Sequence, residues 1–304
     1  MRTCKRISLA ALLLFMNVPD TRAVTFVTHF IGGAAPANTS GGGNLDDIMN
    51  AAVRLWESAY SDPFTVTLYY GWAEVGSAGT HTLLEQGDNP NREISGRILF
   101  DNSGAAAFYL DPTPDVNEEY LRLTEEYQDL GGGYVNVARL FVNPAGDAAG
   151  HIDLLSVALH EIGHALGLSG ANISFREQSS AGVIYISEDL PFAGTVVPLA
   201  SNNAGVVAHL DATEIAYGGV MAGINGDERR IPSALDILAN AQISGFTILD
   251  LYPQQPSQSD QIEADDGSSS RGRLASPRSP GSSRPANLTR SQEDRSYRVR
   301  NGAR

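Results

Sequence analysis

Two histidines and a glutamate stand close together in the middle of the chain, as His160, Glu161 and His164. In a helix, residues four apart project from the same side, so the two imidazoles could hold one metal ion between them. Neutral imidazole nitrogens bind zinc at roughly 2.0–2.1 Å. Glu161 could take a proton from a metal-activated water and deliver it to a leaving amine. The alternative is a core helix with two surface histidines.

The residues around this motif predict the helix that must position it. Asp153 can cap its first turn by accepting hydrogen bonds from free main-chain amides. The apolar residues that follow recur at helical spacing and predict a core-facing stripe: Leu155, Leu159, Ile162 and Leu166. Glycines weaken a helix, so we expect a close packing contact at Gly163 and the end of the helix at Gly167.

A catalytic zinc site needs a third protein ligand and leaves a fourth position for water. The single cysteine, Cys4, lies in a segment expected to be removed, so thiolate ligands and disulfides are excluded from the mature chain. We favour His209, because three neutral imidazoles leave the metal its full charge. It could instead be an ordinary surface or core residue. A carboxylate ligand is the other alternative, from Glu177, Glu188, Asp211 or Glu214.

Residues 160–167 read His-Glu-x-x-His-x-x-Gly, and here the chain resembles the metzincin clan of zinc metalloproteases. In most members a third His, or an Asp, follows three residues after that glycine. This chain has Gly170 there, which has no side chain to bind a metal. The leishmanolysin-like members carry an insertion at this point. The resemblance therefore implies a similar insertion, at about residues 168–208, that returns His209 to the metal.

A second point of resemblance is the run Gly-Val-Met-Ala-Gly at residues 219–223, which is similar to the metzincin Met-turn. It implies that Met221 lies beneath the metal ligands, and core filling is the alternative. Ser233 caps a helix in the place of the clan's C-terminal helix. Tyr217 could donate to an oxyanion, and a structural aromatic is the alternative. The resemblance covers roughly residues 45–246. It implies an α+β fold with a mixed twisted sheet, a long active-site helix and a C-terminal helical subdomain.

The first half of the chain alternates between helix and strand, as α+β and α/β layer arrangements do. Strands are expected at residues 24–30, 64–70, 97–101, 106–110 and 134–142. Helices are expected at residues 45–60 and 117–130, and a long polar loop at residues 71–91. Three further histidines receive no role: His29, His81 and His151, the last expected to be exposed.

Composition divides the chain into three segments. Residues 1–23 are typical of a secretion signal, with a positive start, an apolar stretch too short to span a bilayer, and a small residue at the end. A buried N-terminal strand or helix is the alternative. Residues 24–252 suffice for one catalytic domain. Residues 253–304 are poor in apolar and rich in Ser, Arg and Pro residues, which predicts a disordered tail.

The formal net charge is −14, and residues 24–252 hold 28 acidic residues, eight arginines and no lysine. Such a surface repels nucleic acid and anionic membranes. It could hold calcium, although no calcium motif is present, and a solvated acidic surface is the plainer interpretation. No further segment is long and apolar enough to span a membrane. We expect a secreted monomer that acts on a protein or peptide substrate.

Together these features predict a secreted zinc-dependent endopeptidase. Zn²⁺ would be held by His160, His164 and His209, and Glu161 would be the general base. Two other functions stay open because of Gly170. One is a non-catalytic metal-binding or adhesion protein on a metzincin scaffold. The other is a zinc hydrolase of a non-peptide substrate.

Overall fold

The computed structural model describes residues 24–87, 90–202, 205–216, 218–224 and 226–254. These residues belong to one compact unit. The expected signal segment, residues 1–23, lies outside the described residues, as does Tyr217. The expected tail also lies outside them, apart from its first two residues. Pro253 is buried and its carbonyl accepts a hydrogen bond from Arg139, so the folded part extends beyond the predicted boundary at residue 252.

Helices and strands are mixed along the chain, which confirms the predicted α+β class. The first strands are β1 (Thr25–Phe30), β2 (Thr65–Ala73), β3 (Gly79–Gly87), β4 (Arg92–Asp101), β5 (Phe108–Tyr109) and β6 (Tyr120–Asp129). The later strands are β7 (Tyr134–Pro144), β8 (Ile152–Asp153), β9 (Val183–Tyr185), β10 (Val196–Asn202), β11 (Gly205–Leu210) and β12 (Glu228–Ile231). The α-helices are α1 (Leu45–Glu57), α2 (Leu154–Ala165), α3 (Ile173–Gln178) and α4 (Ala234–Ser244). Short 3₁₀ turns are η1 (Gly146–Ala148) and η2 (Val220–Ala222).

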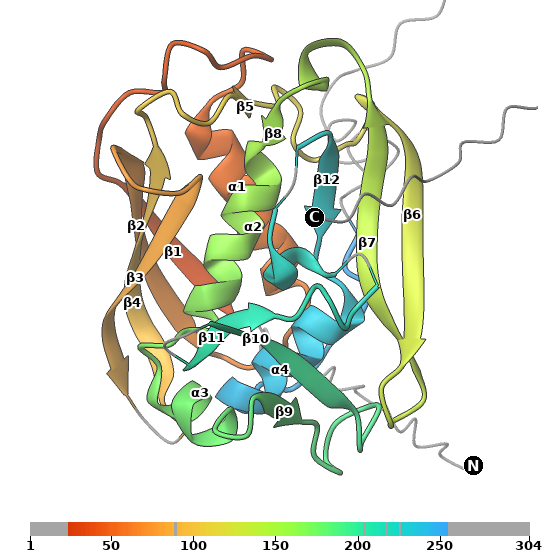
Figure 1. Ribbon diagram of the computed structural model, residues 1–304. Coiled ribbons are helices and arrows are strands. Elements are labelled where there is room, and N and C mark those ends of the chain that lie inside the picture. The colour runs from red at the N-terminus through yellow and green to blue at the C-terminus, as the bar shows by residue number, and fades with distance from the viewer. Residues whose placement is uncertain (1–23, 88–89, 203–204, 217, 225, 255–304) are drawn as a thin grey trace, which may run out of the picture. The chain divides into compact units, whose positions relative to one another are not determined.

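Four strands form the sheet that borders the site, in the order β1-β2-β4-β3. The first three are parallel, and β3 pairs antiparallel with β4 at the edge. Figure 1 shows α1 and α2 lying together beside this sheet. The indole Nε1 of Trp56 donates to Leu159 O at 3.0 Å, which ties the two helices together inside the core.

Three smaller sheets complete the described fold, ordered β12-β7-β6, β11-β10-β9 and β5-β8. In Figure 1 the first lies on the far side of α2 from β1–β4, and the second lies below α2 near α4. Because β12 pairs with β7, residues that follow α2 in the sequence share a sheet with a strand that precedes it. The C-terminal part therefore contains strands as well as α4.

The helix ends follow the capping residues in the sequence. Asn44 accepts from Asp47 N at the start of α1, and the carboxylate of Asp153 accepts from Ser156 N at 2.9 Å at the start of α2. Ser233 and the carboxylate of α4's third residue form a reciprocal capping box. Helix α2 ends at Ala165, and Gly167 follows with a φ of +143°. Glycine adopts such a positive φ without steric cost, so it lets the chain leave the helix there.

The predicted helix at residues 117–130 is wrong, because these residues form β6. Strand β6 pairs antiparallel with β7 through a turn in which Gly131 and Gly133 have positive φ values. Most side chains of β6 are exposed or partly exposed, and β6 is an edge strand, where polar residues cost little. Pairing with the buried strand β7 therefore outweighs local helix propensity.

The predicted polar loop at residues 71–91 is also wrong. Strand β2 runs on to Ala73, residues 79–87 form β3, and β4 begins at Arg92 rather than at residue 97. An edge strand leaves much of its surface in water, so β3 lacks the apolar alternation that marks a buried strand. Three residues of β3 line the cavity of the candidate site.

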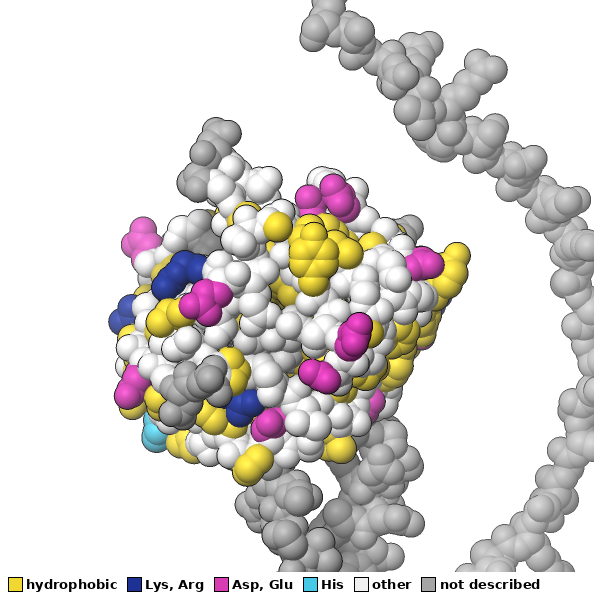
Figure 2. Space-filling model, turned by 90° about the horizontal axis from the view of Figure 1, so that it is seen from below, with side chains coloured by type: hydrophobic (Ala, Val, Ile, Leu, Met, Phe, Trp, Pro, Cys, Tyr) yellow, Lys and Arg dark blue, Asp and Glu magenta, His cyan; other side chains and the backbone are white. Residues whose placement is uncertain are grey.

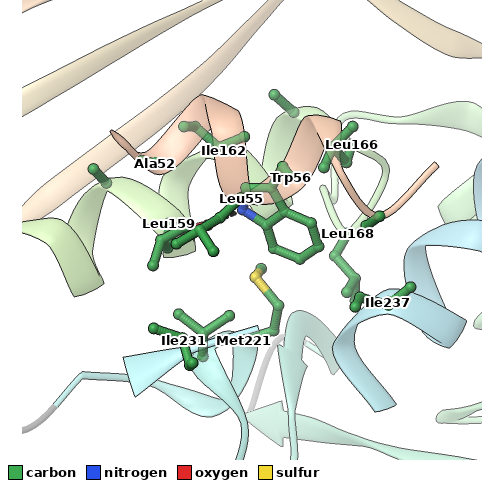
Figure 3. Close-up of a cluster of buried hydrophobic side chains, with 14 of the residues drawn as sticks. Ala52, Leu55, Trp56, Leu159, Ile162, Leu166, Leu168, Met221, Ile231 and Ile237 are labelled. Carbon is green, nitrogen blue, oxygen red and sulfur yellow. Dashed lines mark hydrogen bonds between the residues drawn. The ribbon is translucent and has the colours of Figure 1, made fainter. Parts of the chain in front are cut away.

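The core extends from the sheet strands to the helices, and Figure 3 shows the part of it where α1, α2, α4 and the η2 turn meet. The fully buried side chains there include Trp56, Leu159, Ile162, Met221 and Ile237. On the face shown in Figure 2, acidic side chains are spread among polar groups with fewer arginines, in keeping with the charge of residues 24–252. Within the described residues, no helix has the length and apolar character needed to cross a membrane.

Candidate metal centre

His160 and His164 project from α2 into one cavity, with their Nε2 atoms 3.1 Å apart. The other ring nitrogen of each meets a main-chain carbonyl. His160 Nδ1 lies 2.7 Å from Val220 O, and His164 Nδ1 contacts Leu168 O. A neutral imidazole that donates through Nδ1 keeps the Nε2 lone pair for a metal. The main chain therefore orients both rings as metal ligands.

His209 reaches the same point from β11. Its Nε2 lies 3.1 Å from His160 Nε2, and one nitrogen from each of the three rings lies within 4.8 Å of the others. Two nitrogens on a tetrahedral zinc, each roughly 2.0–2.1 Å from the metal, are about 3.3 Å apart. The structure thus brings together the three histidines that the sequence analysis favoured, and they could hold a metal ion.

Burial keeps these imidazoles in the form that binds metals. Removal from water lowers the pKa of His164 to about 3, lowers that of His160 well below its usual value, and lowers that of His209. All three rings are therefore neutral at pH 7. Three neutral nitrogen donors suit zinc and also other first-row divalent metals, so the donor set fits a metal without identifying it.

Carboxylates do not complete this site in the part of the chain that the structure describes. The three histidines form the single group there with metal-ligand spacing. Asp211, the alternative nearest to His209 in sequence, accepts hydrogen bonds from the main chain and hydroxyl of Thr213. Glu177, Glu188 and Glu214 likewise fall outside the group.

Glu161 lines the same cavity, which has a volume of about 550 Å³. Its carboxylate accepts a hydrogen bond from the main-chain N–H of His81 on β3. Gly79 permits the close approach of the strand, since a Cβ there would lie 2.8 Å from Glu161 Oε1. Burial raises the pKa of Glu161 to about 8. The cavity therefore combines three metal-ligand nitrogens with one buried carboxyl group.

Gly170 also lines this cavity, and a Cβ built there meets no atom within 4 Å. The residues between Gly170 and His209 form α3, β9, β10 and the start of β11. These elements lead the chain back to α2, so that His209 lies next to the imidazoles of His160 and His164. The predicted segment 168–208 is thus folded structure that delivers the third histidine.

Met221 lies beneath α2, buried among core side chains (Figure 3). Its sulfur packs where a side chain on Gly163 would have to be, which explains the glycine in the middle of the helix. The adjoining residue, Val220, supplies the carbonyl that meets His160. Asp236 of α4 accepts hydrogen bonds from the main-chain amides of Val220 and Met221, at 3.1 and 3.0 Å. Asp236 of α4 therefore holds the η2 turn in place, and the turn in its turn contacts His160.

Sequence reasoning missed a buried pair in the wall of the cavity. His81, which received no role, lines the cavity, and its Nε2 lies 2.8 Å from Oε1 of Glu93 on β4. Burial lowers the pKa of His81 to about 4 and raises that of Glu93 to about 9. The signal in the sequence is weak, because the pair depends on strand β3, in a segment whose polar residues predict a loop.

The other two unassigned histidines lie apart from the cavity. His29 stacks on Tyr69 with ring centroids 5.4 Å apart, across neighbouring strands β1 and β2. His151, expected to be exposed, is partly exposed, and its Nδ1 lies 3.0 Å from Ala149 O. Neither residue lines the cavity.

Comparisons of the chain with protein-family models, with curated proteins and with solved structures found no match. The chemistry of the site is therefore inferred from its own residues.

Proposed function

We propose that the protein is a zinc-dependent endopeptidase with a metzincin-like site, the function that its sequence predicts. One observation carries the proposal: Glu161 lies in the same cavity as the three converging imidazoles of His160, His164 and His209. A site that served only to hold a metal would have no use for a buried carboxyl group beside an open cavity. This arrangement favours a hydrolase over a non-catalytic metal-binding protein.

The three histidines would hold the zinc ion. When bound, the ion supplies positive charge that polarises a carbonyl oxygen and acidifies a water molecule. Imidazole nitrogens are the ligands of several catalytic zinc sites, and three of them leave room for water or substrate.

Glu161 would act as the general base and then as the general acid. Burial raises the pKa of Glu161 to about 8 in the metal-free protein, and a divalent cation held beside it would lower that pKa and favour the carboxylate that accepts a proton. The hydrogen bond from the His81 main chain fixes the direction of the carboxylate. In this role Glu161 takes a proton from the attacking water and delivers it to the departing nitrogen.

Strand β3 favours a peptide as the substrate. It is one of the two edge strands of its sheet, and Gly79, Thr80 and His81 line the cavity. An extended peptide can hydrogen-bond to the main chain of such an edge, while its side chains enter neighbouring pockets. The edge would thereby place a peptide bond beside the imidazoles and Glu161.

A digestion experiment with Glu161→Gln tests the proposal. Wild-type protein is loaded with zinc and incubated with denatured casein and with a peptide library, and new termini are identified by mass spectrometry. We expect cleavage that a chelator abolishes, and a loss of about 10²–10⁴-fold in kcat/KM for Glu161→Gln at unchanged zinc content. Near-wild-type turnover of the variant would refute the role of Glu161. A zinc-loaded wild type that cleaves neither substrate would refute the endopeptidase.

A further inference from the structure

His81 and Glu93 form a polar pair that is almost completely shielded from water. Their side chains are 2% and 1% exposed, and Nε2 and Oε1 lie 2.8 Å apart. The second carboxyl oxygen, Oε2, is buried and has no hydrogen-bond partner among the described residues. Burial of a carboxyl group with an unsatisfied oxygen is unfavourable, so such a group calls for a reason beyond filling space.

The sheet is shaped to hold this pair. Gly96 of β4 lies beside both side chains, and a Cβ there would overlap Glu93 Oε1 and come 2.9 Å from His81 Nε2. Its φ is not in the left-handed region, so the main chain itself would accept any residue. The glycine is therefore required by the space that the pair occupies.

His81 contacts the metal centre in two ways. Its ring stacks on that of His164, with centroids 6.1 Å apart and planes inclined by 27°. Its main-chain N–H donates to the carboxylate of Glu161. One residue of β3 thus supports a metal ligand through its side chain and the expected general base through its main chain.

We propose that His81 and Glu93 are positioning residues of the metal centre. Glu93 fixes the ring of His81 through Nε2, and the fixed ring packs behind His164 and restricts its rotation. The same anchoring holds the β3 main chain where its N–H meets Glu161. The role toward Glu161 rests on the proposed function, whereas the role toward His164 requires only that the three histidines bind a metal.

The test compares three variants with the wild type and a control. Glu93→Leu removes the hydrogen bond to His81, Glu93→Gln keeps an uncharged group that can donate to or accept from His81 Nε2, and Gly96→Ala displaces Glu93 without altering either partner. Glu85→Leu makes the same substitution at an exposed position of β3. For each protein we would measure Zn²⁺ affinity by competition with a chromophoric chelator and the visible absorption spectrum of the Co²⁺ form. We would also measure kcat and KM on a peptide and the Tm of the metal-free form.

We expect Glu93→Leu and Gly96→Ala to weaken Zn²⁺ binding by about tenfold, the lower end of what loss of an outer-shell partner costs. Both should change the Co²⁺ spectrum and lower kcat more than they raise KM. Glu93→Gln should recover part of the affinity and the spectrum, and Glu85→Leu should match the wild type.

Wild-type affinity and spectrum in a folded Glu93→Leu variant would overturn the positioning role. If that variant does not fold, the same result in Gly96→Ala would overturn it. A wild type that binds zinc and cleaves no peptide would refute the endopeptidase, while the affinity and spectra would still decide the role of the pair. A wild type that binds neither Zn²⁺ nor Co²⁺ would overturn both proposals.

Discussion

The Nδ1 atom of His160 lies 2.7 Å from the carbonyl oxygen of Val220, so the η2 turn contacts one of the three candidate metal ligands directly. The main-chain amide of Val220 in turn donates to Asp236 at 3.1 Å. A continuous chain of hydrogen bonds therefore runs from α4 through η2 to α2. It fixes the ring that would otherwise be free to rotate away from the other two imidazoles.

Replacement of Asp236 should weaken this chain. Its two carboxylate oxygens accept hydrogen bonds from Val220 N, Met221 N and both the N–H and the hydroxyl of Ser233. In Asp236→Asn, an NH₂ group replaces one of these oxygens and faces groups that are themselves hydrogen-bond donors. We expect a loss of about 1–3 kcal/mol in the free energy of unfolding, measured in urea. Zn²⁺ affinity should fall by about 10–100-fold in a chelator competition. The exposed Asp189→Asn is the control, and equal behaviour of the two variants would contradict the account.

The contact between Gly163 and Met221 predicts that Gly163→Ala changes the free energy of unfolding in the direction opposite to the usual one. Alanine usually stabilises a helix relative to glycine, by about 1 kcal/mol. Gly163→Ala should instead destabilise the protein by about 1–3 kcal/mol, because its Cβ would overlap the sulfur of Met221. In a double-mutant cycle measured by denaturant unfolding, Met221→Ala should remove most of that cost. A stabilising Gly163→Ala, or strict additivity, would show that the two residues do not compete for space.

Loss of His209 should release the metal. His209→Ala removes one of the three candidate ligands. Loss of an outer-shell partner lowers metal affinity by about 10–100-fold, and loss of a ligand itself should lower Zn²⁺ affinity further. Isothermal titration with chelator competition measures this change. The control is His151→Ala, a histidine that does not line the cavity. The ligand set would be wrong if His209→Ala bound zinc as tightly as the control.

The buried ligands should make the metal-free protein sensitive to acid. The folded-state pKa of His164 is about 3, below the usual value near 6.5, so the unfolded chain binds a proton that the folded chain does not. The stability of the folded state is therefore highest above pH 6.5 and falls as the pH drops toward 3. Its slope for one such group is about 1.4 kcal/mol per pH unit.

Urea unfolding of metal-free wild type and His164→Asn, from pH 7 to pH 5, measures this contribution. The wild type should lose stability relative to the variant as the pH falls. Parallel curves, or a relative gain for the wild type on acidification, would contradict the burial of a neutral His164.

The sequence predicted the parts of the site that depend on neighbouring residues. The cap at Asp153, the pair His160 and His164, and the close contact at Gly163 follow from helical spacing and local chemistry. The prediction of His209 as a ligand rests on the need for a third ligand and on a family resemblance. Its position in the structure depends on three strands that the sequence did not predict.

Non-local strand pairing explains what the sequence did not predict. Strand β6 has a local preference for helix and becomes a strand because β7 needs a partner. Strand β3 is an edge strand whose polar residues resemble a loop. The contact of His81 with Glu93 exists only once β3 pairs with β4, and no feature of either segment alone indicates it.

The central claim is that one zinc ion on three imidazoles, with Glu161 beside it, cleaves peptide bonds. The most direct test removes all metal from the protein, verifies the removal by elemental analysis, and follows cleavage of a peptide substrate as Zn²⁺ is added stepwise. The account predicts no activity without metal, and a rise that reaches its plateau at one zinc per chain. Full activity in the verified metal-free protein, or no cleavage with one zinc bound, would contradict it.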